Sequence, residues 1–178
     1  MQQLFLDCTG LVSWLEAIAD FGVGASQSSN VGKMMEALHK GQTIDGEAVQ
    51  LVFSKHVLDT VAFTVNKKGI MTQAASTKLL VMLVKSAIAN GFGRYDSTQE
   101  DLHAAQKAAF GGLCDGDPED IMMMYGATRA NKHASASKTY LVSNDGGARY
   151  WAGAMKVQAL SEAQALELLG IKVLARVA

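Results

Sequence analysis

Cysteine is scarce in this chain, which has only Cys8 and Cys114 among its 178 residues. Two cysteines so far apart form neither a disulfide framework nor a set of metal ligands with a recognisable spacing. Each lies among apolar or small residues, so we expect two buried thiols. We therefore expect a reducing, intracellular setting, where disulfides are rare.

Net charge and long apolar runs are also lacking. A formal net charge of −1 gives no general attraction to nucleic acid, so such binding needs a local basic patch. No basic stretch precedes the apolar residues at the N-terminus, which argues against a secretory signal. The most apolar run, 79–89, contains Lys85 and is too short to span a membrane. We expect a soluble, cytoplasmic protein that makes no membrane contact.

Length and composition predict one globular domain over residues 1–178, with 49% apolar residues to fill its core. Apolar strands alternate with helical patterns along the chain. Strands are expected at residues 3–7, 49–53, 140–143 and, as a brief edge strand, near 156–160. Helices are expected at residues 11–19, 31–39, 55–68, 72–90, 97–110, 118–132, 148–151 and 161–169. Residues 22–30, rich in Gly and Ser, are predicted to form a loop.

This alternation predicts an α/β domain with a mostly parallel sheet. In such sheets the ligand site lies beyond the carboxyl ends of the strands. Asp7 ends the first strand, and Asp145 follows the strand at 140–143, so both should lie at that edge. Asp120 lies in the first turn of a helix that begins with Asp117 as cap and Pro118 at the first position. We expect these carboxylates to meet.

Carboxylates gathered at one edge repel each other and need a compensating charge. A hard divalent cation supplies it, since magnesium prefers oxygen ligands and retains several waters. Such an ion activates a bound water and orients a phosphodiester for in-line attack. Acidic residues on separate elements therefore suggest phosphodiester hydrolysis rather than acyl transfer.

Three motifs resemble those of PIN domains. Leu6-Asp7-Cys8-Thr9 is similar to the Asp-x-Asn/Ser/Thr opening of that family. Asp117-Pro118-Glu119-Asp120, followed by an apolar helix, resembles its third acidic motif. Leu141-Val142-Ser143-Asn144-Asp145 resembles its late Leu-Val-Thr-x-Asp strand, with Ser143 at the Thr position. The order and spacing agree over about residues 3–170.

The resemblance implies a three-layer α/β/α sandwich and a Mg²⁺- or Mn²⁺-dependent nuclease that acts most often on RNA. It also implies a possible homodimer and, as in many members, a toxin held by an antitoxin protein. Carried over residue by residue, the metal-binding carboxylates are Asp7, Asp120 and Asp145. The residues that support the site are Thr9, Asp117 and Ser143.

One position departs from the family pattern. PIN domains usually place a Glu in the helix after the second strand, and here that helix begins Lys55-His56-Val57-Leu58-Asp59-Thr60. Asp59 is the only acid there and is the candidate fourth catalytic carboxylate. Thr60 fits the position equally well, in which case one ligand is missing. The alternative function is then a catalytically weak or inactive PIN-like module that binds RNA or a partner protein.

Simpler structural interpretations stay open for the same acids. Asp7 and Asp145 fit turns at strand ends, and Asp117 fits a helix cap. Asp120 fits a capping box or compensates the helix dipole. Asp59 fits an exposed helix charge.

Basic and aromatic residues near the expected site have two interpretations each. Arg129, Lys132 and Arg149 are the candidates for contacts with the substrate backbone, or they belong to a solvated polar loop. Tyr95, Tyr125, Tyr150 and Trp151 are expected to pack in the core or at its edge rather than stack on bases. The histidines show no ligand spacing and are expected at the surface, and Met122–Met124 are expected to pack in the core.

Overall fold

The computed structural model describes residues 1–98, 118–133 and 138–172, with the backbone alone described at 118–120 and 131–133. The helix expected at 97–110, as well as Cys114 and Asp117, lies outside the described residues. Among the described helices, none combines the length and apolar character needed to cross a membrane.

A five-stranded sheet forms the centre of the described structure, and all its strand pairs are parallel. Its strands are β1 (Gln2–Leu6), β2 (Val49–Ser54), β3 (Gly93–Asp96), β4 (Thr139–Val142) and β5 (Gln158–Leu160). The order across the sheet is β3-β2-β1-β4-β5. The expected α/β class with a mostly parallel sheet is confirmed, and so is a short strand at one edge.

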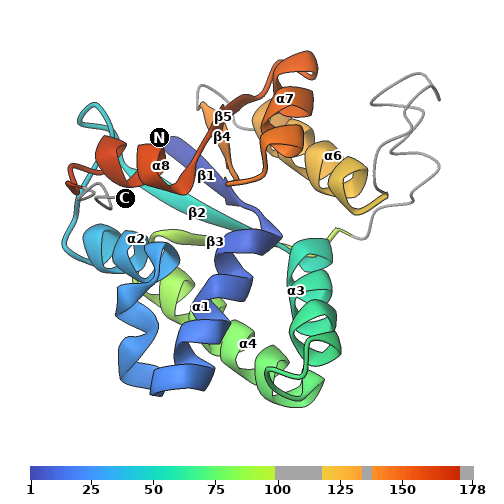
Figure 1. Ribbon diagram of the computed structural model, residues 1–178. Coiled ribbons are helices and arrows are strands. Elements are labelled where there is room, and N and C mark those ends of the chain that lie inside the picture. Colours follow the sequence, from blue (N-terminus) through green and yellow to red (C-terminus); the bar gives the residue numbers. More distant parts are fainter. Residues whose placement is uncertain (99–117, 134–137, 173–178) are drawn as a thin grey trace, which may run out of the picture.

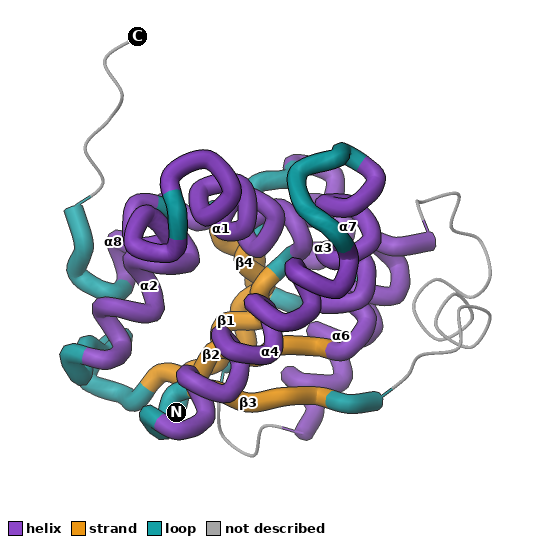
Figure 2. The backbone as a smooth tube through the Cα atoms, turned by 90° about the horizontal axis from the view of Figure 1, so that it is seen from below, coloured by secondary structure: helices purple, strands orange, loops and turns teal. Residues whose placement is uncertain are grey.

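Helices cover both faces of the sheet. They are α1 (Cys8–Phe21), α2 (Asn30–His39), α3 (Lys55–Lys67), α4 (Gln73–Ala89), α6 (Pro118–His133), α7 (Gly146–Ala154) and α8 (Glu162–Leu168). Figure 1 shows α1, α3 and α4 on one side of the strands and α6 and α7 on the other. Figure 2 shows the strands enclosed between these helices, and α8 packs beside α2. The arrangement is consistent with a three-layer sandwich.

The central strand β1 packs closely against the helices on both faces of the sheet. Leu4 and Phe5 of β1 are fully buried, because a parallel strand covered on both faces reads as a continuous apolar run. A side chain in place of Gly126 would put its Cβ 3.1 Å from Phe5 Cζ. Gly126 therefore lets α6 approach β1 closely, and Met123 and Met124 of the same helix are buried as expected.

Two local expectations were wrong, and one strand was missed. Val23–Ser28 forms a short 3-10 helix instead of a loop, and Ser29 caps α2 by accepting a hydrogen bond from the Gly32 amide. Strand β3 was not predicted, because Gly-Arg-Tyr-Asp has no apolar pattern. Helix α7 extends beyond the single turn expected at 148–151.

The carboxyl edge of the sheet brings together polar residues from all five strands. The register pairs Ser54 with Asp96 and Phe5 with Val52, so Asp7 comes opposite Ser54. The Asp7 amide donates to Val142 O at 3.1 Å, and Ser143 N donates to Leu160 O at 2.9 Å. The resulting row is Asp96, Ser54, Asp7, Ser143 and Ser161, with neighbouring backbones about 4.8 Å apart.

Candidate active site at the carboxyl edge

Asp7 is a buried carboxylate held in one orientation by hydrogen bonds. It caps α1 and has an exposed fraction of 5%. Its Oδ1 accepts a hydrogen bond from the Cys8 amide. Its Oδ2 accepts from Thr9 Oγ1 at 3.0 Å and from Ser143 Oγ at 2.5 Å. All three donors are neutral, and within the described part of the chain no ion pair involves Asp7.

Ser143 connects Asp7 to the loop that carries Asp145. Its hydroxyl donates to Asp7 and accepts a hydrogen bond from the Asp145 amide at 3.0 Å. Asp145 caps α7, because its Oδ1 accepts from Ala148 N at 2.8 Å. Asp145 is exposed, whereas Ser143 is fully buried. Hydrogen bonds through Ser143 therefore link Asp7 and Thr9 to the backbone of Asp145, while the expected meeting of the Asp7 and Asp145 carboxylates stays a prediction.

Two further expected residues are described only in part. Asp120 lies in the first turn of α6, as the sequence predicted, and Lys132 lies near the end of the same helix. Only their backbones are described, so their roles stay predictions. Across the described side chains, no group of three His, Cys, Asp or Glu residues is arranged to hold a metal ion.

Asp59 faces a different part of the surface. Its side chain is 65% exposed and pairs with Lys55, one turn earlier on α3. Both residues line an apolar groove of about 390 Å³ between α3 and α4, together with Tyr95 of β3. The described contacts of Asp59 do not connect it to Asp7. Thr60, the alternative at this position, is half-buried.

Arg129 contacts a carboxylate that sequence reasoning missed. Its Nη2 lies 2.7 Å from Oδ2 of Asp96, at the end of β3. Asp96 is 8% exposed, and its Oδ1 accepts from Thr98 N at 3.0 Å. Burial raises the pKa of Asp96, but the hydrogen bonds from Arg129 and Thr98 outweigh it and hold this pKa below its usual value. Arg129, expected to contact substrate, is thus engaged within the protein.

A second missed acid is Glu162, the first residue of α8. It is 5% exposed and accepts a hydrogen bond from Asn30 Nδ2 at 2.7 Å. Its amide donates to Asn144 Oδ1 at 3.1 Å, which ties α8 to the loop before Asp145. A Cβ on Gly10 of α1 would lie 2.7 Å from Glu162 Oε1, so Gly10 makes room for this carboxylate. The sequence could have pointed to this acid, because Glu162 follows the end of β5 just as Asp145 follows the end of β4.

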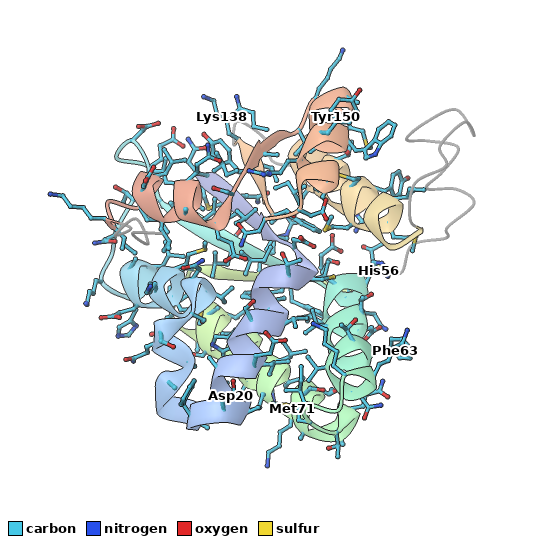
Figure 3. The ribbon with its side chains drawn as sticks, in the orientation of Figure 1. Asp20, His56, Phe63, Met71, Lys138 and Tyr150 are labelled. Atoms are coloured by element: carbon cyan, nitrogen blue, oxygen red, sulfur yellow. The ribbon has the colours of Figure 1, made fainter. Side chains whose placement is uncertain are left out.

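His56 was also placed wrongly by the expectation of surface histidines. Figure 3 shows it at the end of α3 that faces α6. The residue is half-buried, and its Nε2 atom is enclosed without a hydrogen-bond partner among the described atoms. The position of His56 beside the apolar stripe of α3 was a sign of partial burial that the expectation did not use.

The edge also gathers the amino ends of four helices. Asp7 caps α1, Ser54 caps α3, Asp145 caps α7 and Ser161 caps α8. Helix amino ends carry partial positive charge and favour bound anions such as phosphate. The edge therefore combines the capping carboxylates of Asp7 and Asp145 with the partial positive charge of four helix ends.

Arg149, one turn after Asp145, lies beside a broad hollow on the outer side of α7. Its Nε donates to Asp145 O at 3.4 Å. The hollow has a volume of about 660 Å³ and is lined by residues of α7, α8 and the β5 region. Tyr150 at its rim is 73% exposed and contacts the ring of Trp151, so of the two expected positions, in the core or at its edge, it does not occupy the core.

Comparison of the sequence with models of known protein families and with curated proteins found no match.

Proposed function

We propose that this chain is a Mg²⁺- or Mn²⁺-dependent ribonuclease of PIN type that hydrolyses RNA phosphodiester bonds. The observation that carries the proposal is the Asp7 carboxylate, which is buried at the carboxyl edge of a parallel sheet with neutral donors around it. A buried charge without a counter-charge is unfavourable, so this position suits a cation.

The oxygen ligands present fit a hard divalent ion. Asp7 and Asp145 would hold it, with Asp120 as the expected third ligand, and oxygen is the donor that Mg²⁺ and Mn²⁺ prefer. When bound, the ion lowers the pKa of a water molecule and orients the scissile phosphate. Thr9 and Ser143 fix the direction of the Asp7 oxygens by their hydrogen bonds. The amino end of α3, which the neutral Ser54 caps, favours the negative charge of the phosphate.

The test is cleavage of a fluorescently labelled single-stranded RNA by the purified chain with Mg²⁺, with Mn²⁺ and with EDTA. We expect cleavage with either metal, none in EDTA, and a loss of at least about 100-fold in Asp7→Asn, as for removal of one electrostatic catalytic group. Asp20→Asn is the matched control, since Asp20 is an exposed residue at the opposite end of α1 (Figure 3).

Asn still accepts a hydrogen bond at a helix cap, so Asp7→Asn is expected to stay folded. Metal-independent cleavage, or full activity in Asp7→Asn, would contradict the proposal.

The position of Asp59 favours a second candidate, a PIN-like module that binds RNA or a partner protein without turnover. Its side chain pairs with Lys55 over the α3–α4 groove, and its described contacts lie away from Asp7. The fourth carboxylate usual in the family would then be lacking. This candidate predicts RNA retention on a filter without cleavage under any metal condition, and turnover with Mg²⁺ would exclude it.

The proposed ribonuclease could also act as a toxin that an antitoxin protein inhibits by covering the carboxyl edge. In that case RNA cleavage appears only after the antitoxin is removed. The check is to purify the chain from its native host, dissociate any small co-purifying protein in denaturant and assay cleavage after refolding.

A further inference from the structure

The hollow beside α7 lies next to the proposed active site. Its lining begins at Gly146, the residue after Asp145, and continues past Arg149 to Lys156 and Gln158. Since α7 begins at the carboxyl edge, the hollow leads away from Asp145 along the outer side of this helix. At about 660 Å³ it has room for a nucleotide.

Charge in the hollow has one sign. Arg149 and Lys156 line it, and its other polar side chains are the neutral Tyr150, Gln158 and Gln164. None of the lining residues is Asp or Glu. In the described structure neither cation forms an ion pair with an acidic residue. An anionic chain leaving Asp145 therefore meets two cations and no repelling carboxylate.

Tyr150 provides an exposed aromatic surface at the rim. The residue is 73% exposed, and Figure 3 shows it on α7. The ring lies edge-on to Trp151, with centroids 5.4 Å apart and an angle of 76° between the planes. This contact supports the ring at one edge and leaves most of its surface in solvent. Such a ring beside cations is the pattern used to stack bases of single-stranded nucleic acid.

Lys156 has an unusual backbone conformation. Its φ is 59°, a left-handed value that favours glycine, and its amide donates to Gly153 O at 3.0 Å. A glycine would fit this turn without strain, so Lys156 adopts this conformation at an energetic cost. The turn places Lys156 in the lining of the hollow.

We propose that this hollow binds a single-stranded tract of the RNA substrate as it leaves the Asp7–Asp145 edge. One base stacks on Tyr150, and flanking phosphates contact Arg149 and Lys156. The inference rests on RNA as the substrate of the proposed function. It does not require the metal, because stacking and phosphate contacts form without it.

Binding is measured by fluorescence anisotropy with fluorescein-labelled U12 RNA in EDTA, where cleavage does not interfere. We expect Tyr150→Ala to weaken binding by about 5- to 100-fold and Tyr150→Phe to restore it, because base stacking needs the ring and not the hydroxyl. Arg149→Gln and Lys156→Gln should each reduce the salt slope by about one. Tyr95→Ala, a partly exposed tyrosine in the α3–α4 groove, is the matched control and should bind normally.

The fluorescence of the unmodified protein gives a second readout. Trp14 is buried and Trp151 borders Tyr150, so RNA stacking should quench Trp151 selectively. Lack of U12 binding by the unmodified chain, or equal binding by Tyr150→Ala, overturns the inference. Binding that depends on Tyr150 without Mg²⁺-dependent cleavage supports the inference while the proposed nuclease activity fails.

Discussion

The Nη2 atom of Arg129 lies 2.7 Å from Oδ2 of Asp96 and joins α6 to the end of β3. Arg129 is 19% exposed and Asp96 is 8% exposed, so this ion pair is largely removed from water. Pairs of this kind gain little over apolar contacts when intact, but loss of one partner leaves a buried charge. The intact pair therefore adds little to the free energy of unfolding, but the loss of one partner lowers it strongly.

Replacing Arg129 alone should destabilise the fold. We expect Arg129→Met to lower the free energy of unfolding by about 3 kcal/mol, the lower end for buried pairs, because Asp96 stays charged and buried. Adding Asp96→Asn should recover most of this loss. Urea unfolding measures both variants. Glu16→Gln, in the exposed Lys68–Glu16 pair, is the control and should change stability by less than about 1 kcal/mol. An additive double variant would contradict the coupling.

The same pair gives a pH dependence. The pKa of Asp96 is lowered in the folded state, since hydrogen bonds from Arg129 and Thr98 outweigh the opposing effect of burial. Stability from this group is then fully present above the unfolded pKa of about 3.9 and is lost as pH falls through the lower folded pKa. Urea unfolding at about pH 6 and at successive values below about pH 4 measures this loss.

Asp96→Asn should lose less stability than the unmodified protein over that acidic interval. The exposed Asp20→Asn reports the effect of removing one negative charge elsewhere. Parallel stability profiles for the unmodified protein and Asp96→Asn would rule out the assignment.

Ser143 should stabilise the fold and also fix the orientation of the Asp7 carboxylate. Ser143→Ala removes the hydrogen bond to Asp7 and the acceptor for the Asp145 amide, so we expect a loss of about 2 kcal/mol in unfolding free energy. If the proposed ribonuclease activity is present, its rate should fall while RNA binding persists. The control is Ser28→Ala, because Ser28 Oγ makes one exposed hydrogen bond to Ala25 O. Equal stability of the two variants would argue against the bridging role.

Lys156→Gly should separate stability from RNA binding. Removal of the left-handed strain should raise the free energy of unfolding by about 1 kcal/mol, while loss of the cation weakens binding to U12 RNA. Thermal unfolding and anisotropy measure the two effects. Asp45→Gly, at another described non-glycine residue with positive φ, serves as the comparison and should gain stability without loss of binding. A Lys156→Gly variant that binds normally would remove Lys156 from the binding surface.

The sequence predicted the core of the site because parallel strands have a simple geometry. Carboxyl ends of neighbouring strands share one edge, so an acid after β1 and a serine after β4 had to come close, and Asp7 and Ser143 do. The starts of α3 and α8 follow the usual capping preference for serine, since Ser54 and Ser161 cap them. These predictions needed only local pattern and strand direction.

Other parts of the site depended on information that local patterns do not contain. The strand β3 is short and polar, so Asp96 was not recognised at a strand end and its pairing with Arg129 was missed. Asp59 and Thr60 lie side by side on α3, and the packing of α4 beside them decides what each faces. Exposure of Tyr150 depends likewise on what covers α7, which the sequence of that helix does not reveal.

Asp7 and Asp145 each begin a helix while standing at the proposed reactive edge. Asparagine keeps a capping oxygen but loses the negative charge, so an exchange at either position can silence chemistry and preserve shape. Under the proposed function, a single exchange to asparagine would thus turn a nuclease into a folded protein without activity. An alanine at the same position removes the capping oxygen as well, which costs about 1 kcal/mol of stability in addition to the charge.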